Sequence, residues 1–424
     1  MRILILGLNY APEAIGIGPY TAGLCKHLAA KGHELRVIAA KPYYPQWQIF
    51  KGYRGGWIRT HENGVDVLRC PVYVPHHPTG LRRLIHHSSF AISAFFPMIA
   101  GAVTFRPELV LTIAPSLIAA PVAGLAAKIA GAKSWLHIQD FEVEAAFATK
   151  LLDETNLAAR LARRIERAII RSFDEFSSIS PEMCRKLESF GIPTDRVTEF
   201  RNWAEIEAIQ PLRRPSSYVT EWNMATQHVA LYSGNIGNKQ GIEILIEAAE
   251  RLRHRDDLTF VICGEGPNRA ELEARASGLT NVRFFDLQPK ERLGEMLGLA
   301  TIHLLPQKAD AADVVLPSKL TNMLASGRPV IVTAAPGTGL AREVEGCGEA
   351  VPPGDALRLA NAIGELLDNP ETWSRFAAAA RERAEAVWSR GQILERFTRR
   401  IEERVPPRSA RRLIDRKWLP FKKK

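Results

Sequence analysis

Short apolar runs alternate with helical patterns along almost the whole chain, in two successive series. The runs are rich in branched residues, which is typical of parallel strands that helices cover on both faces. This alternation predicts an α/β fold with doubly wound parallel sheets, and 424 residues suffice for two such domains. The predicted strands are 3–8, 35–40, 65–70, 109–113, 134–138, 176–179 and 197–202 in the first series, and 229–233, 259–263, 282–285, 302–305, 330–333 and 349–351 in the second.

A polar, proline- and serine-containing segment separates the two series. We predict a first domain over 1–210, a linker over 211–227 and a second domain over 228–384. A helical pattern continues to residue 404, and a basic tail covers 406–424.

The cysteines and the N-terminus indicate a cytoplasmic protein. Five cysteines are scattered without a C-x-x-C pair, which argues against a zinc ribbon or a disulfide framework and fits a reducing compartment. The apolar run at the N-terminus is too short for a signal peptide and is predicted to be a buried strand.

The net charge of +10 comes mainly from the tail, where eight basic residues face one acidic residue, a net +7. The rest of the chain is close to neutral, so the charge does not indicate a nucleic-acid partner. Trp418, Leu419 and Phe421 within the basic tail suit a peripheral position on an anionic membrane surface. The alternative is a disordered, solubilising tail.

Two apolar segments, 81–105 and 109–132, are interrupted by prolines or by Lys128, so neither is a convincing transmembrane helix. The first segment, which begins with Arg82 and Arg83, fits a helix in the membrane interface or a buried crossover helix.

The arginine-rich helix predicted over 157–173 has either a solvated face or one that meets acidic lipid. The aromatic segment 43–63 is predicted to be a loop that faces a cleft or the membrane, or else a packed surface excursion.

A strand, a polar loop and a short helix follow one another in LPQKADAADVVLPSKLTNMLASGRPVIVT, residues 305–333. Ser318 is the predicted N-cap of the helix, and Gly327 is a suitable residue after its end. Free N–H groups at a helix start suit a phosphate, and Ser318, Lys319 and Thr321 add polar groups there. The alternative is an ordinary strand–loop–helix unit without a ligand.

The segment PSKLTNMLASGRPVI resembles the donor site of family 4 glycosyltransferases, most closely the branch of colanic acid and O-antigen enzymes of the WcaI and WbuB type. The resemblance implies a GT-B fold, with two Rossmann-like domains that face across a cleft and a last helix, 385–405, that packs back on the first domain. It implies retaining transfer from a nucleotide diphosphate sugar, GDP-fucose being the donor that this likeness suggests, without a cofactor or metal. A lipid-diphosphate-linked saccharide at the inner face of the cytoplasmic membrane is the implied acceptor.

Within this resemblance, the loop with Gly16 and Gly18 is similar to the acceptor-side glycine loop that lies under the transferred sugar. The G-x-G-x-x-G fingerprint does not follow the first strand directly, so a dehydrogenase is not indicated. Polar residues follow the strand at 134–138, where α/β sheets place ligands. By position Asp140 is the first catalytic candidate and His137 the second.

The second domain contains the donor-binding candidates that the resemblance implies. The family has a basic residue and a lysine at positions where this chain has Asn235 and Gln240, and Lys239 lies one position away. The other candidates are Gly264, Gly266, Leu287 (through its backbone), Ser318, Lys319, Leu320, Thr321 and Asn322.

Most relatives have two glutamates, and this chain has Val314 and Asn322 in their place. Asn322 can still bind a ribose hydroxyl, and Asp310 or Asp313 could replace the first glutamate. Two other functions stay open: a sugar-nucleotide 2-epimerase of the same fold, and a non-catalytic donor-binding partner.

Overall fold

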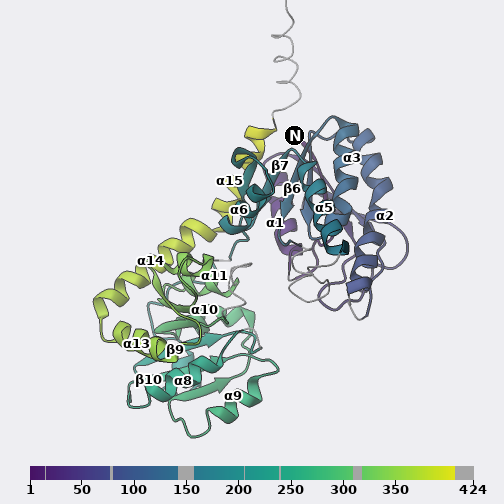
Figure 1. Ribbon diagram of the computed structural model, residues 1–424. Coiled ribbons are helices and arrows are strands. Elements are labelled where there is room, and N and C mark those ends of the chain that lie inside the picture. Colours follow the sequence, from purple (N-terminus) through teal and green to yellow (C-terminus); the bar gives the residue numbers. More distant parts are fainter. Residues whose placement is uncertain are drawn as a thin grey trace, which may run out of the picture. The chain divides into compact units, whose positions relative to one another are not determined.

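The computed structural model describes residues 1–14, 16–76, 80–141, 157–204, 206–237, 240–308 and 318–405 (Figure 1). The chain forms two compact units. The first contains Met1–Asn202 and the residues from Leu394 onward, and the second contains Trp203–Ile393.

The first unit is built on one sheet of buried, branched residues. Its strands, within the described residues, lie in the order β3-β4-β2-β1-β5-β6-β7-β8, and all pairs are parallel except β3 with β4. The strands are β1 Arg2–Gly7, β2 Glu34–Ala40, β3 Ile58–Glu62, β4 Val65–Cys70, β5 Leu109–Ala114, β6 Lys133–Ile138, β7 Glu175–Ser178 and β8 Val197–Glu199.

Strand β3 was not predicted. It lies inside the aromatic segment 43–63 and pairs only with β4, at the edge of the sheet. Its residues alternate between partly buried and exposed, so it lacks the continuous apolar run that marked the other strands. The rest of the segment packs on the helix that follows β4: Trp47 lies 5.5 Å from the His86 ring, and the Trp57 indole donates to the carbonyl of Ser93 at 3.1 Å. These contacts show a segment packed on α2, with the Trp57 side chain still 54% exposed.

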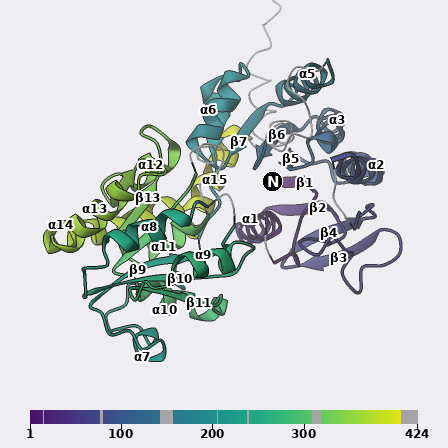
Figure 2. The ribbon, with the colours of Figure 1, turned by 60° about the horizontal axis from the view of Figure 1, so that its bottom comes forward.

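Helices cover both faces of this sheet. Helices α2, α3 and α5 lie side by side along one face, and α1 lies on the other (Figure 2). Helix α6 begins with a side-chain cap: the Ser180 hydroxyl accepts a hydrogen bond from the backbone N–H of Met183 at 3.2 Å. The helices are α1 Gly18–Ala30, α2 Gly80–Thr104, α3 Ala120–Ala130, α5 Leu157–Arg171, α6 Pro181–Ser189 and α15 Arg390–Arg404.

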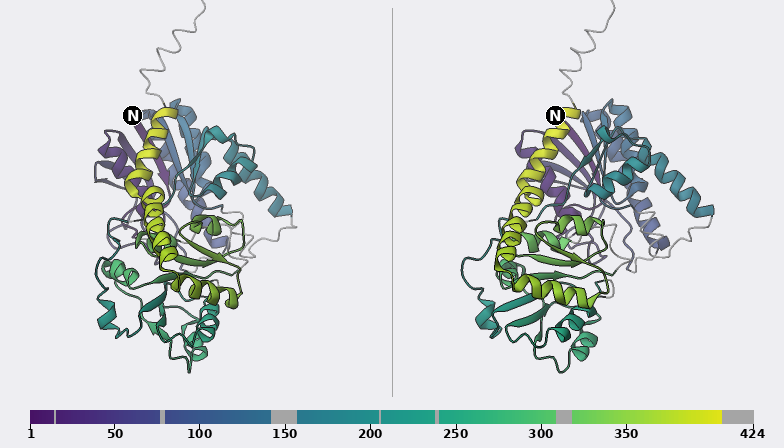
Figure 3. Two further views of the ribbon diagram at one scale, coloured as in Figure 1. Left: turned by 90° about the vertical axis from the view of Figure 1, so that its left-hand side faces the viewer. Right: turned by 60° about the vertical axis from the view of Figure 1, so that its left-hand side comes forward.

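Helix α15 brings the end of the described chain back to the first sheet (Figure 3). The Phe397 ring stacks on Phe200 with centroids 3.9 Å apart and meets Trp135 edge-on at 5.3 Å. The returning segment begins at Leu394, later than the predicted residue 385. The reason is that α14, Pro370–Trp388, buries Ala384 and Trp388 in the core of the second unit.

The second unit has one parallel sheet in the order β11-β10-β9-β12-β13-β14 within the described residues. Its two cores take alternate residues of each strand: Leu231 faces one and Tyr232 the other. The strands are β9 His228–Ser233, β10 Leu258–Cys263, β11 Val282–Phe285, β12 Ile302–Leu305, β13 Val330–Thr333 and β14 Gly348–Val351. The helices are α7 Tyr218–Glu221, α8 Glu243–Arg251, α9 Arg269–Arg275, α10 Leu293–Gly298, α11 Ser318–Ala325, α12 Gly339–Val344, α13 Ala356–Leu367 and α14.

The predicted linker, 211–227, is not a free connection. It contains α7, and Tyr218, Trp222 and Met224 are buried in the core of the second unit. Polar residues around these aromatic side chains obscured their packing in the sequence.

Candidate functional site

The glycines after β9 and β10 allow two loops of the second unit to lie in backbone contact. A Cβ atom on Gly264 would lie 1.9 Å from the carbonyl oxygen of Gly234, and one on Gly266 would lie 2.1 Å from that of Ile236. Both glycines have a φ of 156°, which side chains rarely allow. Gly264 and Gly266, which the sequence analysis names as donor-binding candidates, therefore allow the two loops to touch at the carboxyl edge of the sheet.

Lys319 reaches this edge from the first turn of α11. Its Nζ lies 2.9 Å from the hydroxyl oxygen of Tyr232 and 4.7 Å from the centre of that ring. The Tyr232 hydroxyl in turn donates to the carbonyl oxygen of Asn235 at 2.5 Å. The Lys319 side chain covers Gly234, since a Cβ there would lie 2.3 Å from both Cε and Nζ.

Burial makes the ammonium of Lys319 more acidic than that of an exposed lysine. Desolvation lowers the pKa of its ammonium to about 8, because removal from water disfavours the charged form. A diphosphate beside the ammonium would favour the charged form again. Lys319, the turns after β9 and β10, and the start of α11 thus form a cationic position at the edge where α/β sheets bind ligands.

Two further candidates, Asn235 and Gln240, lie together beside Gly237. A Cβ atom on Gly237 would be 3.0 Å from both the Asn235 Nδ2 and the Gln240 Oε1. Lys239, the side chain of Ser318, Asp310, Asp313 and Val314 lie outside the described residues.

The remaining residues of α11 divide between core and surface. Leu320 is buried in the hydrophobic core, so its side chain does not face a ligand. Thr321 and Asn322 are partly exposed.

Leu287 lies on the loop after β11, and its side chain is 65% exposed. Hydrogen bonds fix the residues on both sides of it. The Arg269 guanidinium donates to the Asp286 carboxylate at 2.6 Å, and the Tyr218 hydroxyl donates to Gln288 Oε1 at 3.0 Å. The loop is therefore positioned by side chains, with Leu287 free of the core.

In the first unit the buried carboxylate of Glu13 connects the glycine loop between β1 and α1 to neighbouring backbone. Glu13 Oε1 accepts hydrogen bonds from the backbone N–H groups of Tyr43 and Tyr44 at 2.9 and 3.0 Å, and Oε2 accepts one from Asn9 at 2.9 Å. Burial raises the pKa of Glu13 above its ordinary value, although these hydrogen bonds oppose the shift. The sequence analysis missed Glu13, because nothing local shows that it binds a segment thirty residues away.

The two glycines of this loop are tightly enclosed. Gly16 has a φ of 74°, and a Cβ on it would lie 3.2 Å from the Tyr44 ring. A Cβ on Gly18 would lie 3.2 Å from the Glu13 Cβ. Glycine at both positions keeps the loop close to the strand ends.

The catalytic candidates of the first unit differ in accessibility. His137 is 1% exposed; its Nδ1 lies 2.9 Å from the Ser177 hydroxyl, and its ring packs on Phe200 at 5.0 Å. Burial lowers the pKa of His137 to about 3, so the imidazole is neutral. Asp140 is partly exposed just beyond the end of β6, at the carboxyl edge of the first sheet.

In the described part of the chain no group of three or more His, Cys, Asp or Glu side chains is arranged to hold a metal ion.

Two family models match the chain in succession. The model "Glycosyl transferase 4-like domain" matches residues 16–203, and "Glycosyl transferases group 1" matches residues 221–383. The fold is that of the GT-B glycosyltransferases, with two Rossmann-like units. The chain belongs to these group 1, family 4-like glycosyltransferases and is an enzyme of that class.

Among curated proteins, the chain is similar to the colanic acid biosynthesis glycosyl transferase WcaI of Escherichia coli K12, with 40% identity over 94% of this chain and 98% of the relative. It is 29% identical to the O-antigen chain mannosyltransferase C of Escherichia coli over 44% of this chain and 50% of the relative.

Solved structures share the fold at low identity. Sucrose-phosphate synthase of Thermosynechococcus elongatus has a TM-score of 0.67 at 18% identity and covers 95% of this chain and 98% of its own. Anabaena HepE in complex with UDP and glucose has a TM-score of 0.61 at 16% identity, over 95% of this chain and all of its own.

Proposed function

We propose that this chain is a retaining glycosyltransferase that moves a sugar from a nucleotide diphosphate sugar to a lipid-diphosphate-linked saccharide. The product would enter colanic acid or a related exopolysaccharide, capsule or O-antigen. The likeness to WcaI over nearly the whole chain supports this pathway class. The observation that carries the proposal is the position of Lys319 beside the glycine turns of β9 and β10.

The donor diphosphate is proposed to lie between Lys319 and the loop at Gly234–Gln240. Charge that develops on the departing diphosphate would be offset by the ammonium and by N–H groups at the start of α11. Each good contact of this kind contributes roughly 3 kcal/mol to the transition state. No metal is required in this proposal, because these groups supply the positive charge.

For the acceptor, we propose that Asp140 hydrogen-bonds either the sugar or the incoming hydroxyl. The hydroxyl attacks the anomeric carbon from the face that the diphosphate leaves, and the departing phosphate oxygen takes its proton. This sequence retains configuration and balances without an external base.

The proposed location is cytoplasmic and peripheral, on the inner face of the cytoplasmic membrane. A lipid-linked acceptor has its saccharide at the bilayer surface, so the enzyme must work there. GDP-fucose is the proposed donor on the likeness to the WcaI branch, and UDP-glucose is a second donor to test because HepE is similar in fold and was solved with it.

Saturation-transfer NMR with UDP-, GDP- and ADP-sugars tests the donor, and turnover with membrane extract tests transfer. Binding of one donor and label in the lipid fraction supports the proposal. Lys319→Ala should weaken binding about tenfold to a hundredfold, whereas Arg275→Ala, which removes an exposed ion pair with Glu247, should leave binding unchanged.

Three other results of these experiments would contradict the proposed glycosyltransferase. Epimerised nucleotide sugar without a lipid product would identify an epimerase, and binding without turnover would favour a non-catalytic partner. If no nucleotide sugar binds at millimolar concentration, the donor site built on Lys319 is wrong.

A further inference from the structure

Exposed apolar side chains are concentrated on one surface of the first unit. Among the described residues, fifteen large hydrophobic side chains are exposed; seven lie on α2, two on α3 and two on α5, which makes eleven of the fifteen. We call this surface the three-helix face. Its exposed apolar residues are Leu81, Leu84, Ile85, Ile92, Phe95, Phe96 and Val103 on α2, Leu125 and Ile129 on α3, and Leu161 and Ile165 on α5.

Two exposed aromatic side chains flank the same face. Trp57 donates its indole N–H to the carbonyl of Ser93, and the backbone N–H of Tyr73 donates to the Ser89 hydroxyl at 2.9 Å. Both partners are near the middle of α2, so the segments that carry these aromatic residues lie beside this helix. Tryptophan and tyrosine are the residues enriched where apolar and aqueous phases meet.

Helix α2 is apolar on its inner side as well. Phe90, Ala94 and Met98 are buried in the core with strand β1, and a Cβ on Gly101 would lie 3.2 Å from the Leu4 side chain. By length and composition this is the one helix, among the described residues, that could cross a membrane. Crossing would remove its inner side from the sheet, so the packing favours a helix that lies along a surface.

The charges on the three-helix face have one sign. Glu166 is the only acidic residue on α2, α3 or α5 in the described range, and it is buried. The exposed charged residues on or next to these helices are Arg82, Arg83, Arg106, Lys128, Arg160, Arg163, Arg164, Arg167 and Arg171. Of these, Arg167 and Arg171 contact Phe190 at the end of α6. A second copy of this face would meet like charge, whereas an anionic surface would meet opposite charge.

We propose that the three-helix face seats the protein on an anionic lipid bilayer. The apolar side chains of α2 and α3 enter the boundary between headgroups and acyl chains, and the arginines of α2 and α5 contact lipid phosphates. Arginine stems lie along apolar surface while their guanidinium groups reach the headgroups. The inference rests on the proposed function for the biological source of the lipid, but its test requires no turnover.

The test is co-sedimentation of the full chain with vesicles of phosphatidylcholine, with and without phosphatidylglycerol. The double variant Ile92→Ser, Phe96→Ser removes two side chains that are 71% and 72% exposed, and it should weaken binding to anionic vesicles at least tenfold. The matched control is Leu357→Ser on α13 of the second unit, 53% exposed, which should bind as the unchanged protein does.

A charge variant separates the electrostatic contribution to vesicle binding from the apolar one. Arg82→Gln with Arg83→Gln should reduce binding to anionic vesicles and its salt dependence, with binding to neutral vesicles unchanged. Circular dichroism and nucleotide-sugar binding confirm that each variant is folded. Donor binding without vesicle binding would overturn this inference and leave the proposed donor site intact. Vesicle binding without donor binding would overturn the proposed donor site and leave this inference intact.

Two results contradict the proposed surface directly. If the double variant binds vesicles as tightly as the unchanged chain, another segment holds the membrane. If the unchanged chain ignores vesicles but self-associates, and the double variant is monomeric by light scattering, the face joins copies of the protein.

Discussion

The ammonium nitrogen of Lys319 lies 2.9 Å from the hydroxyl oxygen of Tyr232, and that hydroxyl donates to the carbonyl oxygen of Asn235. One tyrosine thus connects the cation of α11 to the loop after β9, although the two residues are 87 positions apart. The contact holds the ammonium over Gly234 before any ligand binds.

Donor binding is expected to weaken as the pH rises through about 8. Desolvation lowers the pKa of Lys319 to about 8, so the ammonium is charged below that pH and increasingly neutral above it. Loss of one charge-assisted hydrogen bond should reduce affinity about tenfold to a hundredfold. Calorimetric titration with nucleotide diphosphate from pH 6.5 to 9.5 measures this. Lys319→Arg keeps its charge throughout and should remove the transition, while a flat profile for the unchanged protein would contradict the assignment.

Tyr232→Phe should weaken donor binding about fivefold to tenfold at pH 7, since one hydrogen bond contributes about 1 kcal/mol. The midpoint of the pH profile should also move to lower pH, because the hydroxyl that accepts from the ammonium is lost. Tyr218→Phe is the matched control: its hydroxyl binds Gln288 instead of Lys319, so the midpoint should stay in place. Equal midpoints in both variants would show that Tyr232 is merely structural.

Gly264→Ala is expected to destabilise the protein by at least about 3 kcal/mol. The new Cβ would lie 1.9 Å from the carbonyl oxygen of Gly234, and the residue has a φ of 156°. Gly278→Ala is the control, because it has a φ of 91° with no atom within 4 Å, and it should cost about 1 kcal/mol. Urea unfolding followed by circular dichroism compares them, and similar midpoints would disprove the close contact of the loops.

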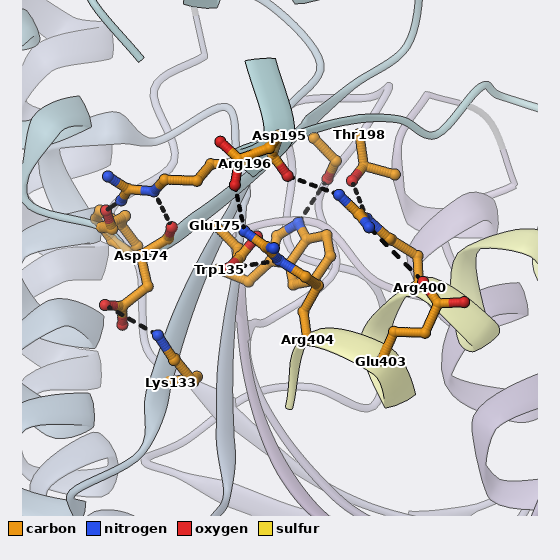
Figure 4. A network of polar contacts seen from close by, with 12 residues as sticks. Lys133, Trp135, Asp174, Glu175, Asp195, Arg196, Thr198, Arg400, Glu403 and Arg404 are labelled. Carbon is orange, nitrogen blue, oxygen red and sulfur yellow. Dashed lines mark hydrogen bonds and ion pairs between the residues drawn. The ribbon is translucent and has the colours of Figure 1, made fainter. Parts of the chain in front are cut away.

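Arg404→Ala should loosen the return of α15 to the first unit. The Arg404 Nε lies 2.9 Å from both carboxylate oxygens of Glu175, whose side chain is 4% exposed (Figure 4). Removing the arginine leaves a buried carboxylate unpaired, at a cost of about 3 kcal/mol. Hydrogen–deuterium exchange over 394–404 should speed up. Glu403→Ala removes only an exposed pair with Arg400 at 3.6 Å and should change exchange little; a comparable change would mean that Glu175 is not the anchor.

The strand series and the position of α11 could be predicted because their signals are local. Branched apolar runs marked the strands of both sheets except β3, and Ser318 and Gly327 bounded a helix that the structure has at Ser318–Ala325. The likeness in PSKLTNMLASG led to a family that the comparisons confirm.

Contacts between distant segments could not be predicted in this way. His137 follows the pattern of a residue at a strand end, yet its ring lies between Ser177 and Phe200. Glu13 appeared as one acidic residue in a loop, and only the fold brings it to the backbone of Tyr43 and Tyr44.

The sequence alone therefore determined the α/β class, the two series of strands and the family. The tertiary structure decided which polar residues are buried, that Tyr232 holds Lys319, and that the apolar residues of α2 divide between the core and an exposed face. The physical reason is that periodicity and capping act over a few neighbouring residues, whereas burial and desolvation depend on which distant segments pack together.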